Sequence, residues 1–216
     1  MLHRVDRNMV ANLKKFMQDI ASKKAPGPST SFTIFHIFYS LELLSIKPLG
    51  RNKLADQLQV GDGAVRTIIS RLRGSELIDT SKTGCTLTEK GKTLWKQFEK
   101  VFPKQIELPK SELSTSEYNH AFLVSNSAQK VGSGIDQRDA AIIAGARQAL
   151  VIIYKDGHLN IQAVSSNIEK LYPKAAAHIL ESMKPAENDV TIVAGAESPL
   201  KAKRGAFAAA WSLVSA

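Results

Sequence analysis

The sequence predicts an α+β protein, with an N-terminal winged helix-turn-helix domain followed by a small α/β sandwich domain. Residues 51–73 show two stretches of helical periodicity separated by a glycine, and residues 77–88 show two short strands around a polar turn. After residue 118 the pattern becomes strand, helix, strand, strand, helix, strand and a terminal helix. This order, βαββαβ with an extra C-terminal helix, indicates a ferredoxin-like arrangement of the second domain.

In the first half, helices are expected where apolar residues recur at three- and four-residue steps, and strands where short apolar runs lie between turn residues. Pro26-Gly27-Pro28 separates the first two helices, and Ser29 to Ser31 can cap the second. Gly61 is expected to supply the tight turn between the third and fourth helices, because glycine tolerates unusual backbone angles. The expected helices are Val5–Ala21, a segment ending near Ser45, Arg51–Leu58, Asp62–Arg73 and Glu89–Val101, and the expected strands are Leu77–Thr80 and Cys85–Thr88.

The division into domains follows from a polar stretch near the middle of the chain. Residues 105–118 are expected to form a linker. Residues 1–104 would then be the winged-helix domain with its N-terminal helix, and residues 119–216 an effector-binding or dimerisation domain. The expected strands of this second domain are Ala121–Ser125, Ala149–Tyr154, His158–Val164 and Val190–Ala194, and its helices are Asp136–Gly145, Ser166–Met183 and Pro199–Val214.

Composition narrows the class of protein. The chain of 216 residues is 44% hydrophobic and 6% aromatic, which is typical of a globular protein. Its apolar runs are shorter than the roughly 18 residues that span a bilayer, and the charged N-terminal residues predict no signal peptide. The single cysteine, Cys85, excludes an internal disulfide and fits a reducing compartment. A cytoplasmic protein without membrane contact is expected.

The net charge of +9 lies entirely in the first half of the chain. Residues 1–104 contain 18 lysines and arginines against nine acidic residues, whereas residues 105–216 contain 11 of each kind. Such an asymmetry favours a half that binds a polyanion, joined to a neutral half with another task. A basic surface that only aids solubility is the alternative.

The helix over Asp62–Arg73 is the expected recognition helix, which would enter the DNA major groove. Val65, Ile68, Ile69 and Leu72 mark its inward face, so the small, polar and basic residues between them are expected to face DNA. Arg66 and Thr67 are the expected base readers, because arginine can contact guanine through two hydrogen bonds. The expected DNA-binding residues are Arg51, Lys53, Gly63, Ala64, Arg66, Thr67, Ser70, Arg71, Arg73 and, at the tip of the wing, Lys82. Lys90 and Lys92 could add phosphate contacts.

Two motifs, "VGDGAVRTIISRL" from Val60 and "LTEKG" from Leu87, resemble winged-helix regulators of the MarR and iron-dependent-repressor types. Together with Gly27-Pro28, "GRNKLA" from Gly50 and "GIDQRDAAIIAGA" from Gly134, they resemble an archaeal family of winged-helix proteins whose C-terminal domain has no known function. The resemblance spans most of the chain and implies a DNA-binding regulator. The metal ligands of the iron-dependent repressors do not carry over, because the five histidines are scattered.

The second half offers a candidate effector site. Glycines and a serine lead from Val131 into a helix start, where free N–H groups can hold an anion, and basic residues begin the last helix. The alternatives are a glycine turn with Asp136 as helix cap, and a solvated or paired set of surface charges. The candidate effector-binding residues are Ser133, Gln137, Arg138, Lys201 and Arg204.

These patterns together predict a sequence-specific regulator of transcription that binds double-stranded DNA. A homodimer is expected, modulated by a small anionic effector or by dimerisation through the second domain. One alternative is a winged helix used for protein contacts, and another is an enzyme acting on a phosphorylated small molecule through the second domain. Since no nucleophile and base stand together in the sequence, no enzyme activity is expected, and neither a metal nor a cofactor is.

Overall fold

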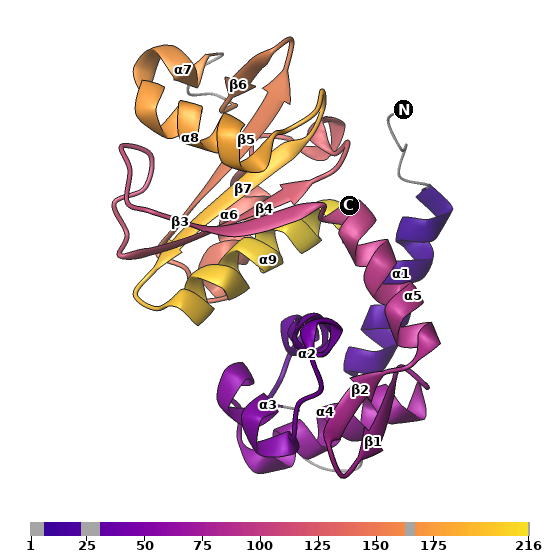
Figure 1. Cartoon of the computed structure of the whole chain (residues 1–216). Helices are drawn as coiled ribbons and strands as arrows, with labels where there is room; N and C mark the ends of the chain where they lie inside the picture. The colour runs from indigo at the N-terminus through magenta and orange to yellow at the C-terminus, as the bar shows by residue number, and fades with distance from the viewer. Residues whose placement is uncertain (1–6, 23–30, 163–166, 216) are drawn as a thin grey trace. The chain divides into compact units, whose positions relative to one another are not determined.

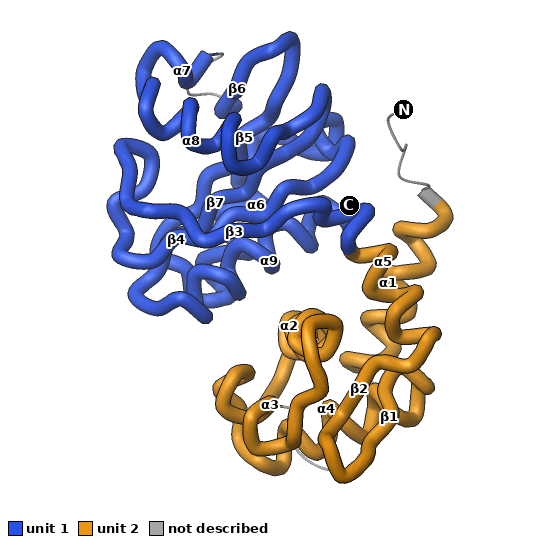
Figure 2. Tube along the Cα trace, viewed as in Figure 1, with its two compact units in different colours: residues 1–7, 99–216 blue, residues 8–98 orange. Residues whose placement is uncertain are grey.

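The computed structural model describes residues 7–22, 31–162 and 167–215. The proline-rich break at 26–28 lies outside these residues, as do Ser29 and Thr30 of the segment expected to cap the second helix. The chain divides into two compact units, one of residues 8–98 and one that begins at Glu99 (Figure 2). Within the described residues, no helix is both long enough and apolar enough to span a membrane.

The first unit has the element order of a winged helix (Figure 1). Its core surrounds the apolar helix α2, where Phe38 packs edge-on against Phe98 with ring centroids 5.1 Å apart and lies 5.5 Å from Trp95. The elements are α1 (Arg7–Ser22), α2 (Ile34–Ile46), α3 (Arg51–Leu58), α4 (Asp62–Gly74), β1 (Ile78–Ser81), β2 (Gly84–Leu87) and α5 (Glu89–Val101).

The wing is the antiparallel hairpin of β1 and β2, and a third segment joins it. The N–H of Leu49 donates to the oxygen of Cys85 at 3.1 Å, and the N–H of Cys85 donates back at 2.8 Å. Gly84 makes this close approach possible, because a Cβ there would lie 2.6 Å from the carbonyl carbon of Leu49 and its φ is +119°. The wing is therefore tied to the residues just before α3.

The second unit is an antiparallel sheet with helices on both faces (Figure 1). Helices α6 and α9 cover one face, where Phe122 packs against Phe207 at 6.0 Å between ring centroids. Helix α8 covers the other, where Ile179 and Met183 join a core with Leu123 and Val193. The elements are β3 (Lys104–Leu108), β4 (Tyr118–Val124), the 3-10 turn η1 (Ala128–Lys130), α6 (Ile135–Ile143), β5 (Gln148–Lys155), β6 (His158–Asn160), α7 (Ile168–Leu171), α8 (Pro173–Met183), β7 (Val190–Ala196) and α9 (Pro199–Ser215).

Two predictions about this unit are wrong in detail. Residues 104–108, expected for the most part in a linker, form the edge strand β3, which pairs with β4. The element order βαββαβ is present after β3, but the strands lie in the order β3-β4-β7-β5-β6. A ferredoxin-like sheet has its first and third strands in the middle, whereas here the second and fourth, β5 and β7, lie there. β3 and β7 occupy both edges of β4, and β6 pairs with β5, to which a tight turn joins it.

Candidate nucleic-acid interface

Helices α3 and α4 form the helix-turn-helix through a shared apolar face. Leu54 and Leu58 of α3 are buried, as are Val65, Ile68 and Leu72 of α4. The turn between the helices works differently from the expectation. Gly61 has an ordinary extended conformation (φ −66°) and caps α4, while the left-handed residue is Gln59, with φ 52°. Gly61 is therefore not required by the backbone of the turn.

The opposite face of α4 is open to solvent. Four of the residues expected to contact DNA, Gly63, Arg66, Ser70 and Arg73, are exposed, and Ala64 and Thr67 are partly exposed. The Thr67 hydroxyl donates to the oxygen of Gly63 at 2.9 Å, one turn back. Of the expected phosphate contacts, Lys53 and Arg73 are exposed and form no ion pair with any described residue.

Asp62 links two of the expected DNA-binding arginines. Its carboxylate lies 2.7 Å from Arg66 and 3.2 Å from Arg51, so one acidic side chain joins the start of α3 to the first turn of α4. All three side chains are about half exposed, and such pairs contribute little stability, on the order of 0–1 kcal/mol. Their effect is to orient Arg66. The spacing of Asp62 and Arg66, one helical turn, could have indicated this pair from the sequence.

Arg71 corrects a prediction. It was expected to point away from the core and meet a phosphate, but only 8% of its surface is exposed. Its Nη1 donates to the main-chain oxygens of Ile20 and Ala21 at 2.9 and 2.6 Å, and its guanidinium lies 4.9 Å from the ring centroid of Phe32. Arg71 therefore satisfies carbonyls in the last turn of α1, which have no partner within that helix.

The wing and α5 present fewer free charges than expected. Lys82 is exposed at the tip, where a Ser81–Thr83 hydroxyl contact of 2.7 Å closes the turn. Lys90 and Lys92 are already paired, with Glu76 at 3.0 Å and Glu89 at 2.7 Å respectively. The hydrogen bond from Lys92 and its charge hold the pKa of Glu89 below its usual value.

The motif "LTEKG" has a structural explanation. Leu87 is buried, and the Thr88 hydroxyl accepts from the N–H of Gly91 at 3.1 Å while donating to the oxygen of Glu76 at 2.7 Å. Thr88 thus caps α5. A Cβ at Gly91 would collide with the main-chain oxygen of Leu77. These residues dock α5 on the segment that follows α4, so the motif itself serves the fold of the winged helix.

Gly63 lacks any such explanation in the fold. It lies in the first turn of α4, its φ is not positive, and a Cβ built there would meet nothing within 4 Å. Glycine inside a helix costs roughly 0.5–1 kcal/mol relative to alanine. The helix would therefore be more stable with alanine here, and the missing side chain leaves room for something outside the chain.

Comparison with known proteins relates the first unit to a family of DNA-binding domains. Residues 34–102 match the family model described as "CggR N-terminal DNA binding domain". They form a winged-helix DNA-binding domain. Residues 115–213 match a model described as a domain of unknown function, DUF4443. The resemblance seen in the motifs, a DNA-binding winged helix followed by a domain of unknown function, is thereby confirmed, and the match supports a DNA-binding regulator of transcription.

Two solved structures are similar to the chain. The hypothetical protein PH0730 from Pyrococcus horikoshii OT3 is 27% identical, with a TM-score of 0.69, over 85% of this chain and 93% of its own. ZitR from Lactococcus lactis is 23% identical over 42% of this chain and 69% of its own, but its TM-score of 0.28 is too low to support an argument. No curated protein matches the chain.

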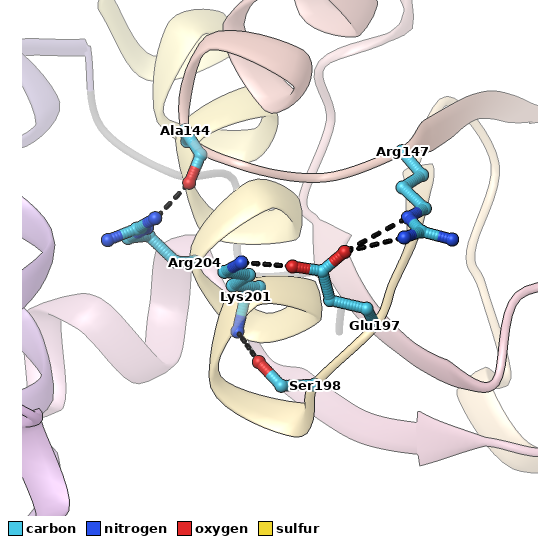
Figure 3. Close-up of polar contacts among 6 residues, drawn as sticks. All are labelled: Ala144, Arg147, Glu197, Ser198, Lys201 and Arg204. Carbon is cyan, nitrogen blue, oxygen red and sulfur yellow. Dashed lines mark hydrogen bonds and ion pairs between the residues drawn. The ribbon is translucent and has the colours of Figure 1, made fainter.

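The candidate effector residues of the second unit do not form one site. Ser133 precedes α6, where Gly134 takes a left-handed conformation (φ 81°) as the helix cap, and Arg138 pairs with its neighbour Asp139 at 3.0 Å. Gln137 is buried. Arg204 lies instead at the far end of α6, where its Nε donates to the oxygen of Ala144 at 2.5 Å (Figure 3).

Lys201 is also occupied. Its ammonium group pairs with Glu197, which Arg147 contacts at 2.7 Å from the other side (Figure 3). The two cations hold the pKa of Glu197 below its usual value. Lys201 and Arg204 thus both make contacts within the protein, and their binding of an effector stays a prediction. In the described ranges, no three histidines, cysteines or carboxylates gather as metal ligands would.

Proposed function

We propose that the protein binds specific sequences in double-stranded DNA, as a homodimer, with α4 in the major groove. The observation that carries the proposal is the match of residues 34–102 to a DNA-binding family, on a unit whose α4 presents an open face of small and basic side chains. Arg66 and Thr67 would read bases. The proposed phosphate contacts are Arg51, Lys53, Ser70, Arg73 and Lys82.

The first turn of α4 supports this orientation. Gly63 and the small Ala64 leave the N-terminal end of the helix without bulk, which is the end that recognition helices direct at base edges. The free space at Gly63 has no use within the fold, and a base pair or a sugar-phosphate would fill it.

Asp62 gives Arg66 a defined starting position. In the free protein its carboxylate holds the guanidinium beside the start of α3. On DNA, Arg66 would exchange this carboxylate for a guanine edge, while Arg51 would exchange it for a phosphate. The exchange costs little for exposed pairs, and it discourages Arg66 from settling on any nearby phosphate.

The first experiment selects bound duplexes from a random DNA library at about 150 mM salt, because nonspecific phosphate contacts weaken steeply with salt. An enriched motif with two half-sites about 34–36 Å apart, or a multiple of that spacing, would support a dimer on DNA. Enrichment of no motif would refute sequence specificity, and a single unrepeated half-site would refute the dimer.

A second experiment separates base reading from charge. Arg66→Ala should lower affinity for the selected site and relax preference at one base position, a loss of about 1–3 kcal/mol in discrimination. Lys82→Ala should weaken all duplexes alike and reduce the salt slope by about one. Lys96→Ala is the matched control, since it removes one exposed charge from α5 without touching α4 or the wing. Equal effects of all three would show that only net charge matters.

A further inference from the structure

A cavity of about 420 Å³ lies in the second unit, between the segment that follows β3 and helix α8. Its volume falls within the range of roughly 300–1,000 Å³ typical of small-molecule sites. Its lining comes from the end of β3 and the segment after it, from α8, and from β4 and β7. The cavity contains none of the residues that the sequence suggested for an effector.

Part of the lining is apolar. Ile179 of α8 and Val193 of the central strand β7 are buried, and Leu108 at the end of β3 and Leu113 of the covering segment are partly buried. These four side chains come from three separate parts of the chain and meet around one hollow. They suit a ligand with a compact hydrocarbon body, because removing apolar surface from water is favourable.

The covering segment is held by a buried polar network. The Ser114 hydroxyl, which is 3% exposed, donates to the Asn119 side-chain oxygen and accepts from Gln148. The backbones of Ser111 and Ser114 also exchange hydrogen bonds of 2.9 and 3.2 Å. Because the segment is anchored to β4 and β5, the cavity is formed before any ligand arrives.

The charges around the cavity are unbalanced. Lys110 and Lys174 form no ion pair with any residue in the described part of the chain. The one carboxylate in the lining, Glu112, accepts a hydrogen bond from the N–H of Ala175 at 3.3 Å, in the first turn of α8. Two lysines therefore remain for an anionic group that enters beside Glu112.

We propose that this cavity binds a small organic acid, with its hydrocarbon body against Leu113, Ile179 and Val193 and its carboxylate beside Lys174. The acid is the effector of the proposed regulator, and this regulatory role rests on the proposed function. Binding itself does not depend on it. The covering segment follows β3 directly, and β3 begins three residues after the last residue of α5, Val101. A ligand that shifts the segment therefore acts on a part of the chain that leads directly back to the DNA-binding unit.

Nuclear magnetic resonance of the full chain with labelled Ile, Leu and Val methyl groups tests the proposal without DNA. The probes are 3-phenylpropanoate and octanoate, each compared with its neutral amide up to 10 mM. Both acids should shift the methyl signals of Leu113, Ile179 and Val193, and the amides should bind at least tenfold more weakly. Acids that leave these signals unchanged, or acids and amides that bind alike, would overturn the proposal.

Two variants locate the site. Ala175→Leu fills the cavity from α8 and should abolish the shifts, while Lys174→Gln, at an exposed position that the fold does not need, should reduce acid binding to the level of the amides. Lys170→Gln is the matched control, since it removes an exposed lysine of α7 outside the lining and should change nothing. Unchanged acid binding by Lys174→Gln would refute the site. DNA affinity measured with and without acid then tests regulation separately.

Discussion

Arg71 donates hydrogen bonds to the main-chain oxygens of Ile20 and Ala21, so an arginine of the recognition helix holds the end of α1. Arg73, two residues later, is exposed and forms no ion pair with any described side chain. Two arginines in the same helical turn thus serve different ends, one the stability of the winged helix and the other its surface charge.

Replacing each arginine should have opposite effects on stability and on DNA binding. Arg71→Ala should destabilise the first unit by about 2–3 kcal/mol, because it leaves buried carbonyls without a donor. Arg73→Ala should change stability by less than about 0.5 kcal/mol but weaken DNA binding. Thermal unfolding and fluorescence anisotropy with a labelled duplex measure the two effects. If Arg71→Ala unfolded like the wild type, the role of Arg71 given above would be wrong.

Gly63→Ala should separate stability from binding. The methyl group has free space, so the variant should be more stable by about 0.5–1 kcal/mol, yet it should bind the selected DNA less tightly. Gly74→Ala is a useful control, because that glycine also has open space but lies at the other end of α4. Undiminished affinity in Gly63→Ala would argue against a close approach of DNA at this turn.

Gly91→Ala should have the opposite effect on stability. The added Cβ would collide with the main-chain oxygen of Leu77, which lies in backbone and cannot swing aside. We expect a loss of about 1–3 kcal/mol, as is common for overpacked cores. Gly61→Ala, with no neighbour within 4 Å of the new methyl, should be tolerated. Chemical denaturation of both variants provides the comparison, and equal stabilities would contradict the docking of α5 described here.

His120 predicts a pH dependence of the second unit. It is buried beside Phe122 and near the positive charge of Lys203; burial, then that charge, lowers its pKa from 6.5 to about 3. Between pH 3 and 6.5 the histidine is protonated in the unfolded chain but neutral in the folded one. The free energy of unfolding therefore falls as the pH drops below about 6.5. From pH 7 to 4.5 this group should cost about 2.5 kcal/mol.

In a Trp95→Phe variant, the tryptophan fluorescence comes from Trp211 of α9, so it reports the unfolding of the second unit. His120→Gln should lose less stability over the same interval, while other titrating groups contribute equally to both proteins. Parallel pH profiles of the two would mean that His120 is protonated as easily in the folded state as in the unfolded chain.

Helical periodicity was sufficient to predict the faces of α4. Val65, Ile68 and Leu72 are buried, Ile69 is partly buried, and Arg66 and Ser70 are exposed, because one apolar stripe decides the orientation of a short helix. Arg71 escaped prediction since its partners are main-chain oxygens some 50 residues earlier in the chain. No local pattern reports such a contact.

Other features could be found from the sequence only in part. Ile106 and Leu108 alternate with polar neighbours as in a strand, but the serines and prolines around them favoured a linker. The strand order depends on that missed strand, because β3 takes one edge of β4. The cavity needs residues 108–114 and α8 together, a juxtaposition that only the folded sheet creates.

The end of α5 decides how the protein can be divided. Phe102 packs against Phe122 and Phe207 at 5.6 and 6.1 Å, and the oxygen of Val101 accepts from Ser125 at 3.0 Å. A fragment ending at residue 104 would carry Phe102 into water, and one beginning at Tyr118 would leave the edge of β4 bare and prone to aggregation. A soluble C-terminal fragment must therefore begin at or before Glu99. That residue lies within α5, which the sequence pattern predicts as one continuous helix.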